Sequence, residues 1–211
     1  MKKMVLAVIA VILMSAPVFS EFNLRTSLDI AGDYKIKTGR GNINAPGSEN
    51  YDTSVSVTLS GEYIVPAIEN YLKVGCGFEL PVPRRYYRDD GYTFWHMPVY
   101  LSAQTNPVPR LPELFFRLNL GYNLLFLDTM HWDSSYISVN YKRGLYYSFS
   151  AGWEFPFGLF VDATYAVYNS GIEYKHLYFS QTADITYSRA GIGVGYKFKG
   201  HLNIPNINII M

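Results

Sequence analysis

The feature that most constrains this chain is an alternation of apolar residues with a period of two, which recurs in eight segments. The clearest segment is LFFRLNLGYNLLF, residues 114–126, in which every second residue is apolar. The alternating residues run over 22–30, 55–65, 72–80, 95–103, 116–126, 147–155, 159–167 and 192–198. Each segment is roughly ten residues long, which is the length of a tilted β-strand that crosses a membrane. The pattern predicts eight strands.

The connections between these segments alternate in length. The longer, polar ones are 37–51, 84–92, 128–142 and 169–182, and the shorter, proline-bearing ones are 66–70, 105–113 and 156–158. Long extracellular loops and short periplasmic turns are typical of outer-membrane barrels. An open sheet edge in hydrocarbon would leave backbone groups unpaired, so we expect closure. The predicted fold is all-β, an eight-stranded antiparallel up-and-down transmembrane β-barrel over residues 21–198.

The face that alternates with the apolar one is rich in glycine and balanced in charge. Its five cationic and five anionic members are Arg25, Lys73, Arg117, Arg189 and Lys197, and Asp29, Glu62, Glu79, Glu154 and Asp162. A soluble exterior would carry many more Lys and Glu side chains. A soluble lipid-binding barrel, apolar inside and polar outside, is the alternative that this composition disfavours. We therefore expect the polar face to line the lumen and the apolar face to contact lipid.

The lumen of an eight-stranded barrel is only just wide enough for its side chains to fill it. We expect the ten charged residues to form a hydrogen-bonded network of ion pairs, because removing one partner of a buried pair costs about 3–5 kcal/mol. Such a network leaves at most a narrow pore. His96 falls on the same face, and we expect it near Glu79, either as a hydrogen-bonded core histidine or as a proton-sensitive gate.

The two ends of the chain differ from the predicted barrel. Residues 1–20 combine a basic start, a short apolar run and small residues before Ser20, which is typical of a signal peptide cleaved near Ser20. Residues 199–211 form a short tail, which we expect either to lie in the periplasm or to pack across the barrel mouth. The single cysteine, Cys76, excludes an intramolecular disulfide, and the net charge of +1 gives no reason to expect a nucleic-acid partner.

Four stretches resemble successive strands of the bacterial outer-membrane β-barrel domain family, the porin-family relatives of the OmpA, OmpX and OmpW barrels: MPVYLSAQTNP, LFFRLNLGYNLLF, YYSFSAGWEFPFGLFVDATYAVY and RAGIGVGYKF. The resemblance covers residues 93–198 well and the earlier strands only by pattern. It implies the barrel fold, an outer-membrane location and recognition of the final strand, ending at Phe198, by the barrel-assembly machinery. It identifies a class of barrel and no individual activity.

Enzymatic activity is not expected, although small outer-membrane barrels include lipid-acting hydrolases. Such a hydrolase needs a nucleophile activated by a base that a third group orients. The stretch nearest in pattern to a deacylase site, residues 167–171, contains no histidine, and His131, His176 and His201 fall in predicted loops or the tail. We predict no catalytic residue, no cofactor and no metal site, and a structural or surface-interaction role for a monomer.

One predicted loop carries a concentrated basic patch, formed by Arg84, Arg85 and Arg88 with two tyrosines between them. Arginine and aromatic side chains together suit phosphate or sugar groups, so lipopolysaccharide and other outer-membrane lipids are candidate partners. The following residues, Asp89 and Asp90, partly neutralise the patch. The alternative is an ordinary solvated loop with interfacial tyrosines.

Overall fold

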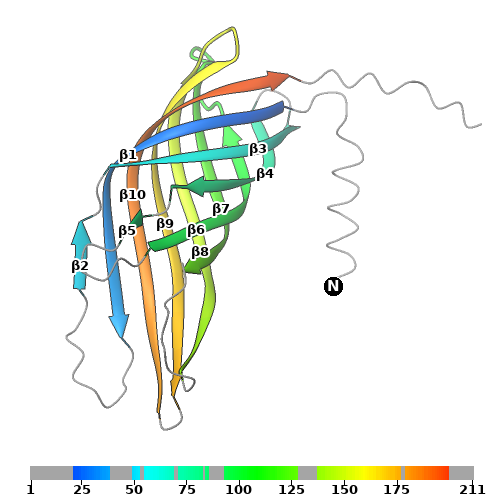
Figure 1. The fold of residues 1–211 in the computed structure, drawn as a ribbon. Helices are drawn as coiled ribbons and strands as arrows, with labels where there is room; N and C mark the ends of the chain where they lie inside the picture. The colour runs from blue at the N-terminus through cyan, green and yellow to red at the C-terminus, as the bar shows by residue number, and fades with distance from the viewer. Residues whose placement is uncertain are drawn as a thin grey trace, which may run out of the picture.

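The computed structural model describes residues 21–38, 49–52, 55–68, 71–82, 84–85, 93–127, 137–176 and 179–199 (Figure 1). All of its elements are strands: β1 (Glu21–Thr38), β2 (Glu49–Asp52), β3 (Ser56–Ile68), β4 (Leu72–Pro81), β5 (Arg84–Arg85), β6 (Thr93–Thr105), β7 (Leu114–Leu127), β8 (Ile137–Glu154), β9 (Leu159–His176) and β10 (Phe179–Lys199). Within these ranges no helix is long and apolar enough to span a membrane. The signal-peptide prediction for residues 1–20 lies outside the described residues, as does nearly all of the predicted tail.

Eight of the strands form one closed antiparallel sheet. The order around it is β1-β3-β4-β6-β7-β8-β9-β10, and β10 pairs with β1 to complete the ring. Figure 1 shows the first strand, in blue, beside the last, in orange-red. The short strand β2 extends the pairing of β1, and β5 pairs with β6. The predicted eight-stranded antiparallel up-and-down barrel is therefore confirmed.

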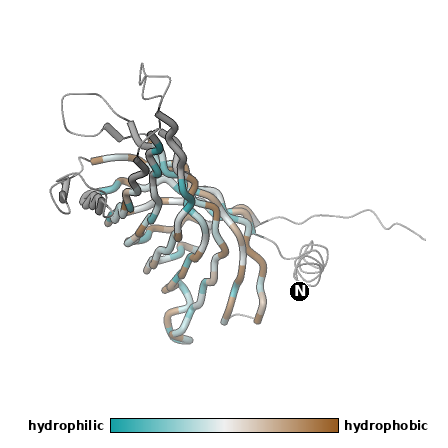
Figure 2. The backbone as a smooth tube through the Cα atoms, turned by 90° about the horizontal axis from the view of Figure 1, so that it is seen from below, coloured by the Kyte–Doolittle hydropathy of each residue, from teal (hydrophilic) through white to brown (hydrophobic). Residues whose placement is uncertain are grey.

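The burial pattern is inverted relative to a soluble protein. Buried side chains include many charged or polar ones, such as Arg189 and Glu79, each about 2% exposed. Leu101 and Tyr122 on the outer face are 68% and 65% exposed. Figure 2 shows the hydrophilic and hydrophobic residues alternating along the strands. Because the outer face is apolar and the interior polar, this barrel is built for a hydrocarbon surrounding, and the predicted orientation of the two faces is confirmed.

One side of the wall is taller than the other. Pairing of β7 with β8 ends at Asn123 and Gly144, whereas pairing of β8 with β9 continues to Ile137 and His176. Strands β10 and β1, of 21 and 18 residues, also extend on this side and pair as far as Thr38 with Ala183. We call this extension of β8, β9, β10 and β1, with β2 at its edge, the tall sheet.

The tall sheet corrects the predicted loop boundaries. The segment 169–182 is wrong as a loop, since β9 runs to His176 and β10 begins at Phe179. The segment 128–142 is also too long, because β8 begins at Ile137, and 37–51 contains the start of β2. On β9 the outward register of this extension is Asn169, Gly171, Glu173 and Lys175, so the apolar alternation that marks the lower strands does not continue there.

The tight turn between β8 and β9 depends on Gly158, whose φ is +93°. Its N–H donates to the carbonyl of Phe155 (3.0 Å), and its carbonyl accepts from Lys197 (2.9 Å). An added Cβ would also lie 3.0 Å from the carbonyl oxygen of Lys197. A left-handed conformation costs a residue with a Cβ about 1–2 kcal/mol.

We therefore expect Gly158→Ala to lower the free energy of unfolding by about 1–2 kcal/mol, measured by urea titration of the refolded protein. Gly171→Ala is the matched control, because a Cβ there meets its nearest atom at 3.3 Å and no unusual φ is involved. Equal losses for the two variants would contradict the conformational explanation.

Candidate functional site

The candidate site is the lumen of the barrel, which is lined by alternate residues of all eight wall strands. Glycines on this face leave room for large neighbours. A Cβ on Gly193 would lie 2.6 Å from Cζ of Arg25, and a Cβ on Gly121 would lie 2.7 Å from Cβ of Tyr100. Real Cβ atoms do not approach this closely, so the wall glycines are what admit the arginine and tyrosine side chains into a narrow interior.

Arg189 on β10 is the centre of the largest network. Its guanidinium pairs with Asp29 on β1 and with Glu79 on β4, the latter at 2.7 Å. Its Nε donates to the hydroxyl of Tyr168 (2.6 Å), and that hydroxyl donates to Glu79 (2.6 Å). Tyr146 donates a further hydrogen bond to Glu79 (2.9 Å). Strands from opposite sides of the barrel are thereby joined through one carboxylate.

Two further arginines pair with carboxylates nearer the turn end. Arg25 binds Asp162 in a two-point contact, Nε to Oδ2 at 2.8 Å and Nη2 to Oδ1 at 2.6 Å. Arg117 pairs with Glu62 at 2.9 Å and donates to Gln104 at 3.0 Å. Charge-assisted, two-point contacts of this kind are the strong class of hydrogen bond and hold planar groups in a fixed orientation.

The guanidinium of Arg117 lies beside a pair of aromatic rings and contacts both. Its Cζ is 5.1 Å from the ring centroid of Phe115 and 5.5 Å from that of Phe160. The two rings meet edge to face at 5.9 Å. Both rings are buried, so this level of the lumen is filled by hydrocarbon and a stacked cation.

The two remaining predicted cations lie at the turn end and share an acid that the sequence analysis did not include. Glu21 contacts Lys73 at 3.0 Å and Lys197 at 3.5 Å, and Lys197 also pairs with Glu154. Glu21 directly follows the predicted cleavage site at Ser20 and is the first residue of the predicted barrel. Its position two residues before Asn23 and four before Arg25 places it on the same polar face, and that register is the signal that could have identified it.

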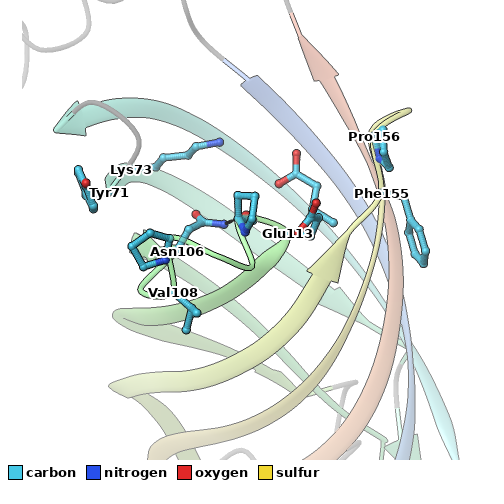
Figure 3. A pocket seen from close by; sticks show the side chains of 10 residues that line it. Tyr71, Lys73, Asn106, Val108, Glu113, Phe155 and Pro156 are labelled. Atoms are coloured by element: carbon cyan, nitrogen blue, oxygen red, sulfur yellow. Dashed lines mark hydrogen bonds between the residues drawn. The ribbon is translucent and has the colours of Figure 1, made fainter.

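Beside these pairs the turn end opens into a cavity of about 580 Å³ (Figure 3). Lys73, Glu113 and Glu154 line it together with Tyr71 and Asn106. The amide of Asn106 donates to the carbonyl oxygens of Pro112 (2.7 Å) and Leu114 (3.2 Å), which fixes the proline-rich turn at its rim. Lys73 and Glu154 belong to these ion pairs, so the pairs form part of the cavity wall.

A stack of tyrosines that sequence reasoning missed fills the middle of the lumen. Ring centroids lie 5.3 Å apart for Tyr100 and Tyr146, 5.1 Å for Tyr146 and Tyr168, and 5.4 Å for Tyr168 and Tyr187. The alternation alone could have found them, because all four fall in register with polar residues. Aromatic girdles usually place tyrosine on the lipid face, whereas these four tyrosines are buried in the lumen.

His96 continues this stack toward the loop end. Its ring lies 5.8 Å from that of Tyr187, at an interplanar angle of 10°, and its Nδ1 is 2.8 Å from the amide nitrogen of Asn123. The amide of Asn123 is therefore placed where we expected Glu79, while Glu79 is bound by Arg189 and two tyrosines. This geometry is that of a packed, hydrogen-bonded histidine.

The other predicted residues lie apart from the lumen network. Arg84 and Arg85 form β5 and pair with Phe94 and Thr93, so the basic patch is partly strand instead of the predicted loop over 84–92. Arg88 lies outside the described residues, as do His131 and His201. No group of three or more potential metal ligands occurs in the part of the chain that the structure describes.

The closed sheet, the apolar outer face and the ion-paired interior together define a transmembrane β-barrel with a packed lumen. No protein-family model matches the sequence, and no curated protein matches it either. Among solved structures the chain is similar to the outer membrane protein OprG from Pseudomonas aeruginosa, with a TM-score of 0.53, 12% identity, and coverage of 88% of this chain and 99% of OprG.

Two other solved structures are more distant. The neisserial surface protein NspA gives a TM-score of 0.49 at 16% identity, over 84% of this chain and 97% of NspA. The attachment invasion locus protein Ail of Yersinia pestis gives 0.46 at 14% identity, over 85% of this chain and 99% of Ail. The closed sheet and the likeness to OprG give the chain the fold of the small eight-stranded outer-membrane barrels, as the resemblance predicted.

Proposed function

We propose that this protein is a non-enzymatic outer-membrane barrel whose lumen is a structural plug and whose role is structural or surface-interacting. The observation that carries the proposal is the Arg189 network. Arg189 is fully buried and holds Asp29 and Glu79, on strands β1 and β4, at once. A conducting lumen would need a continuous wet path past these groups, and their mutual pairing opposes it.

The tall sheet supports a surface-interaction role. It raises β8, β9, β10 and β1 past the point where β7 stops pairing with β8. Backbone ladders of this length cost chain entropy to order, and the packed barrel beneath them supplies the rigid base. We propose that the tall sheet is extracellular, that residues 1–20 are removed after Ser20, and that residues 199–211 lie in the periplasm.

The proposed partners follow from the same topology. We propose that lipids and lipopolysaccharide surround the apolar wall, and that Arg84, Arg85 and Arg88 contact anionic headgroups. The strand RAGIGVGYKF, residues 189–198, is the proposed signal for the barrel-assembly machinery. We propose a monomer without cofactor. A lipid-acting hydrolase remains the second class of function, and lipid analysis of a deletion strain distinguishes it, because only a hydrolase alters lipid acylation.

The proposed plug predicts no steady large conductance in planar bilayers. The wild-type protein, refolded and checked by heat-modifiable gel migration, should give at most small or transient current steps. Replacing Arg25 and Asp162 together by serine removes a two-point ion pair without leaving a lone charge, and we expect larger or more frequent steps from that variant. Steady large channels from the wild-type protein would contradict the plug.

A further inference from the structure

The turn-end cavity of about 580 Å³ contains an acid that the lumen network does not use. Glu113 lines this cavity and is half-buried there, beside Asn106 and Lys73 (Figure 3). Among the described residues the carboxylate of Glu113 has neither a hydrogen-bond partner nor an ion-pair partner. Arg110, in the same turn, is exposed and forms no ion pair with it in the described part of the chain. Glu113 therefore brings an uncompensated negative charge to the cavity.

A second carboxylate lies directly across from Glu113. Leu114 pairs with Trp153 in the register of β7 and β8, and at the next position the N–H of Glu154 donates to the carbonyl of Glu113 (2.9 Å). The side chains of Glu113 and Glu154 both line the cavity. Like charges directly opposite each other on neighbouring strands are destabilising. A cation bound between the two carboxylates would remove this repulsion.

The ammonium groups at this end of the barrel already have partners. Lys73 lies 3.0 Å from Glu21, and Lys197 contacts Glu21 at 3.5 Å and also pairs with Glu154. Together with Glu113 these side chains bring three carboxylates and two ammonium groups to the mouth, so one negative charge is in excess. That excess belongs to Glu113, since the other two acids are held in ion pairs.

The rest of the lining indicates which kind of cation fits. Calcium takes six to eight oxygen ligands, and no group of three or more potential metal ligands occurs among the described residues. Much of the cavity wall is hydrocarbon, from Tyr71, Val108, Pro109, Pro112 and Pro156. The volume is within the range of about 300–1,000 Å³ that is usual for small-molecule sites. A cation that carries its own apolar chain therefore suits this cavity, and one excess charge matches one ammonium group.

We propose that the turn-end cavity binds a primary alkylammonium group, with its nitrogen between Glu113 and Glu154 and its chain against Val108 and the neighbouring prolines. This binding site goes beyond the structural role proposed above, and it does not require the plug to open, because the ligand enters at the mouth. A free alkylamine and the lysine side chain of a peptide present the same chemistry, and the test distinguishes these two sources.

The test is an NMR titration of the protein, refolded into detergent micelles, with n-butylammonium chloride and with Nα-acetyl-lysine amide. The backbone amide signals of Asn106, Arg110 and Glu113 should shift saturably with at least one of the two probes, and the lower Kd identifies the source. n-Butanol has the same chain without the charge and should bind at least about tenfold more weakly. Tighter binding of Mg²⁺ than of either amine would contradict the proposal.

Glu113→Gln removes the charge, keeps the shape of the side chain and should raise the Kd of the amine about tenfold. Asp184→Asn is the matched control, because it removes the charge of an exposed acid on β10, in the tall sheet at the other end of the barrel, and should leave the Kd unchanged. Val108→Trp keeps both carboxylates but fills the cavity, and should also weaken binding about tenfold.

Three results would overturn the proposal: no saturable shift with either amine, an equal Kd for the wild type and Glu113→Gln, or equal weakening by Asp184→Asn. Heat-modifiable gel migration of every variant shows whether the barrel is folded, so a loss of binding is separated from a loss of structure. The charge variant and the filling variant act independently, so either of them tests the site if the other does not fold.

Discussion

Replacing Arg189 by methionine is expected to lower the free energy of unfolding by about 3–5 kcal/mol, the largest effect of any single change considered. The substitution removes the shared partner of Asp29 and Glu79 and leaves both carboxylates in the lumen. Tyr168 also loses the guanidinium that donates to its hydroxyl. Urea titration of the protein refolded into lipid vesicles, followed by tryptophan fluorescence, measures the change.

Two comparisons make this result specific. The triple variant R189M/E79Q/D29N removes the stranded charges, and should recover a substantial part of the lost stability. Lys175→Met breaks an exposed pair with Glu173, whose atoms are 3.6 Å apart, and should change stability by less than about 1 kcal/mol. If the triple variant is no more stable than Arg189→Met, the destabilisation has a cause other than unpaired charge.

The second large effect is expected from a charge on the lipid face. Val194→Arg places a cation on the outer face of β10, at a residue 48% exposed and well inside the apolar band. In a bilayer this should cost about 2–4 kcal/mol, because arginine near the midplane loses its hydration. Unfolding in vesicles, compared with the wild type under the same conditions, measures it.

Phe157→Arg is the matched control. Phe157 is 64% exposed, but it lies in the turn between β8 and β9, at the end of the barrel, where the expected cost is about 0–1 kcal/mol. In a soluble barrel both positions would be ordinary surface sites and both changes would fall within about 0.5 kcal/mol. A negligible effect of Val194→Arg in vesicles would therefore contradict the membrane location.

The strands of the barrel outside the tall sheet could be predicted from the sequence, because a lipid surrounding requires an alternating apolar pattern. A strand between hydrocarbon and a polar lumen must keep its outward residues apolar, as every second residue from Phe116 to Phe126 is. The strand extensions of the tall sheet could not be predicted, because this apolar pattern does not continue through them. Strand β9 continues from Tyr168 to His176, but its outward register there is Asn169, Gly171, Glu173 and Lys175, so the apolar face that marks the rest of the strand is missing.

The lumen residues could be predicted as a set, but their partners could not. Arg25 binds Asp162, which is 137 residues away in the sequence, and Arg189 reaches Asp29 across 160 residues. Which charges meet depends on the stagger of all eight strands, and a period of two carries no information about stagger. Glu21 and the tyrosine stack could have been placed by the same register that located the charges.

The contact between β1 and β10 also sets the order in which this molecule can be assembled. Each neighbouring hairpin can pair as soon as its two strands exist, but the joint between the first and last strands requires the entire chain. The pairs of Asp29 with Arg189 and of Glu21 with Lys197 both cross that joint. These two ion pairs therefore form only after the other strands have paired. Removing either pair should raise the unfolding rate of the barrel more than it lowers the folding rate.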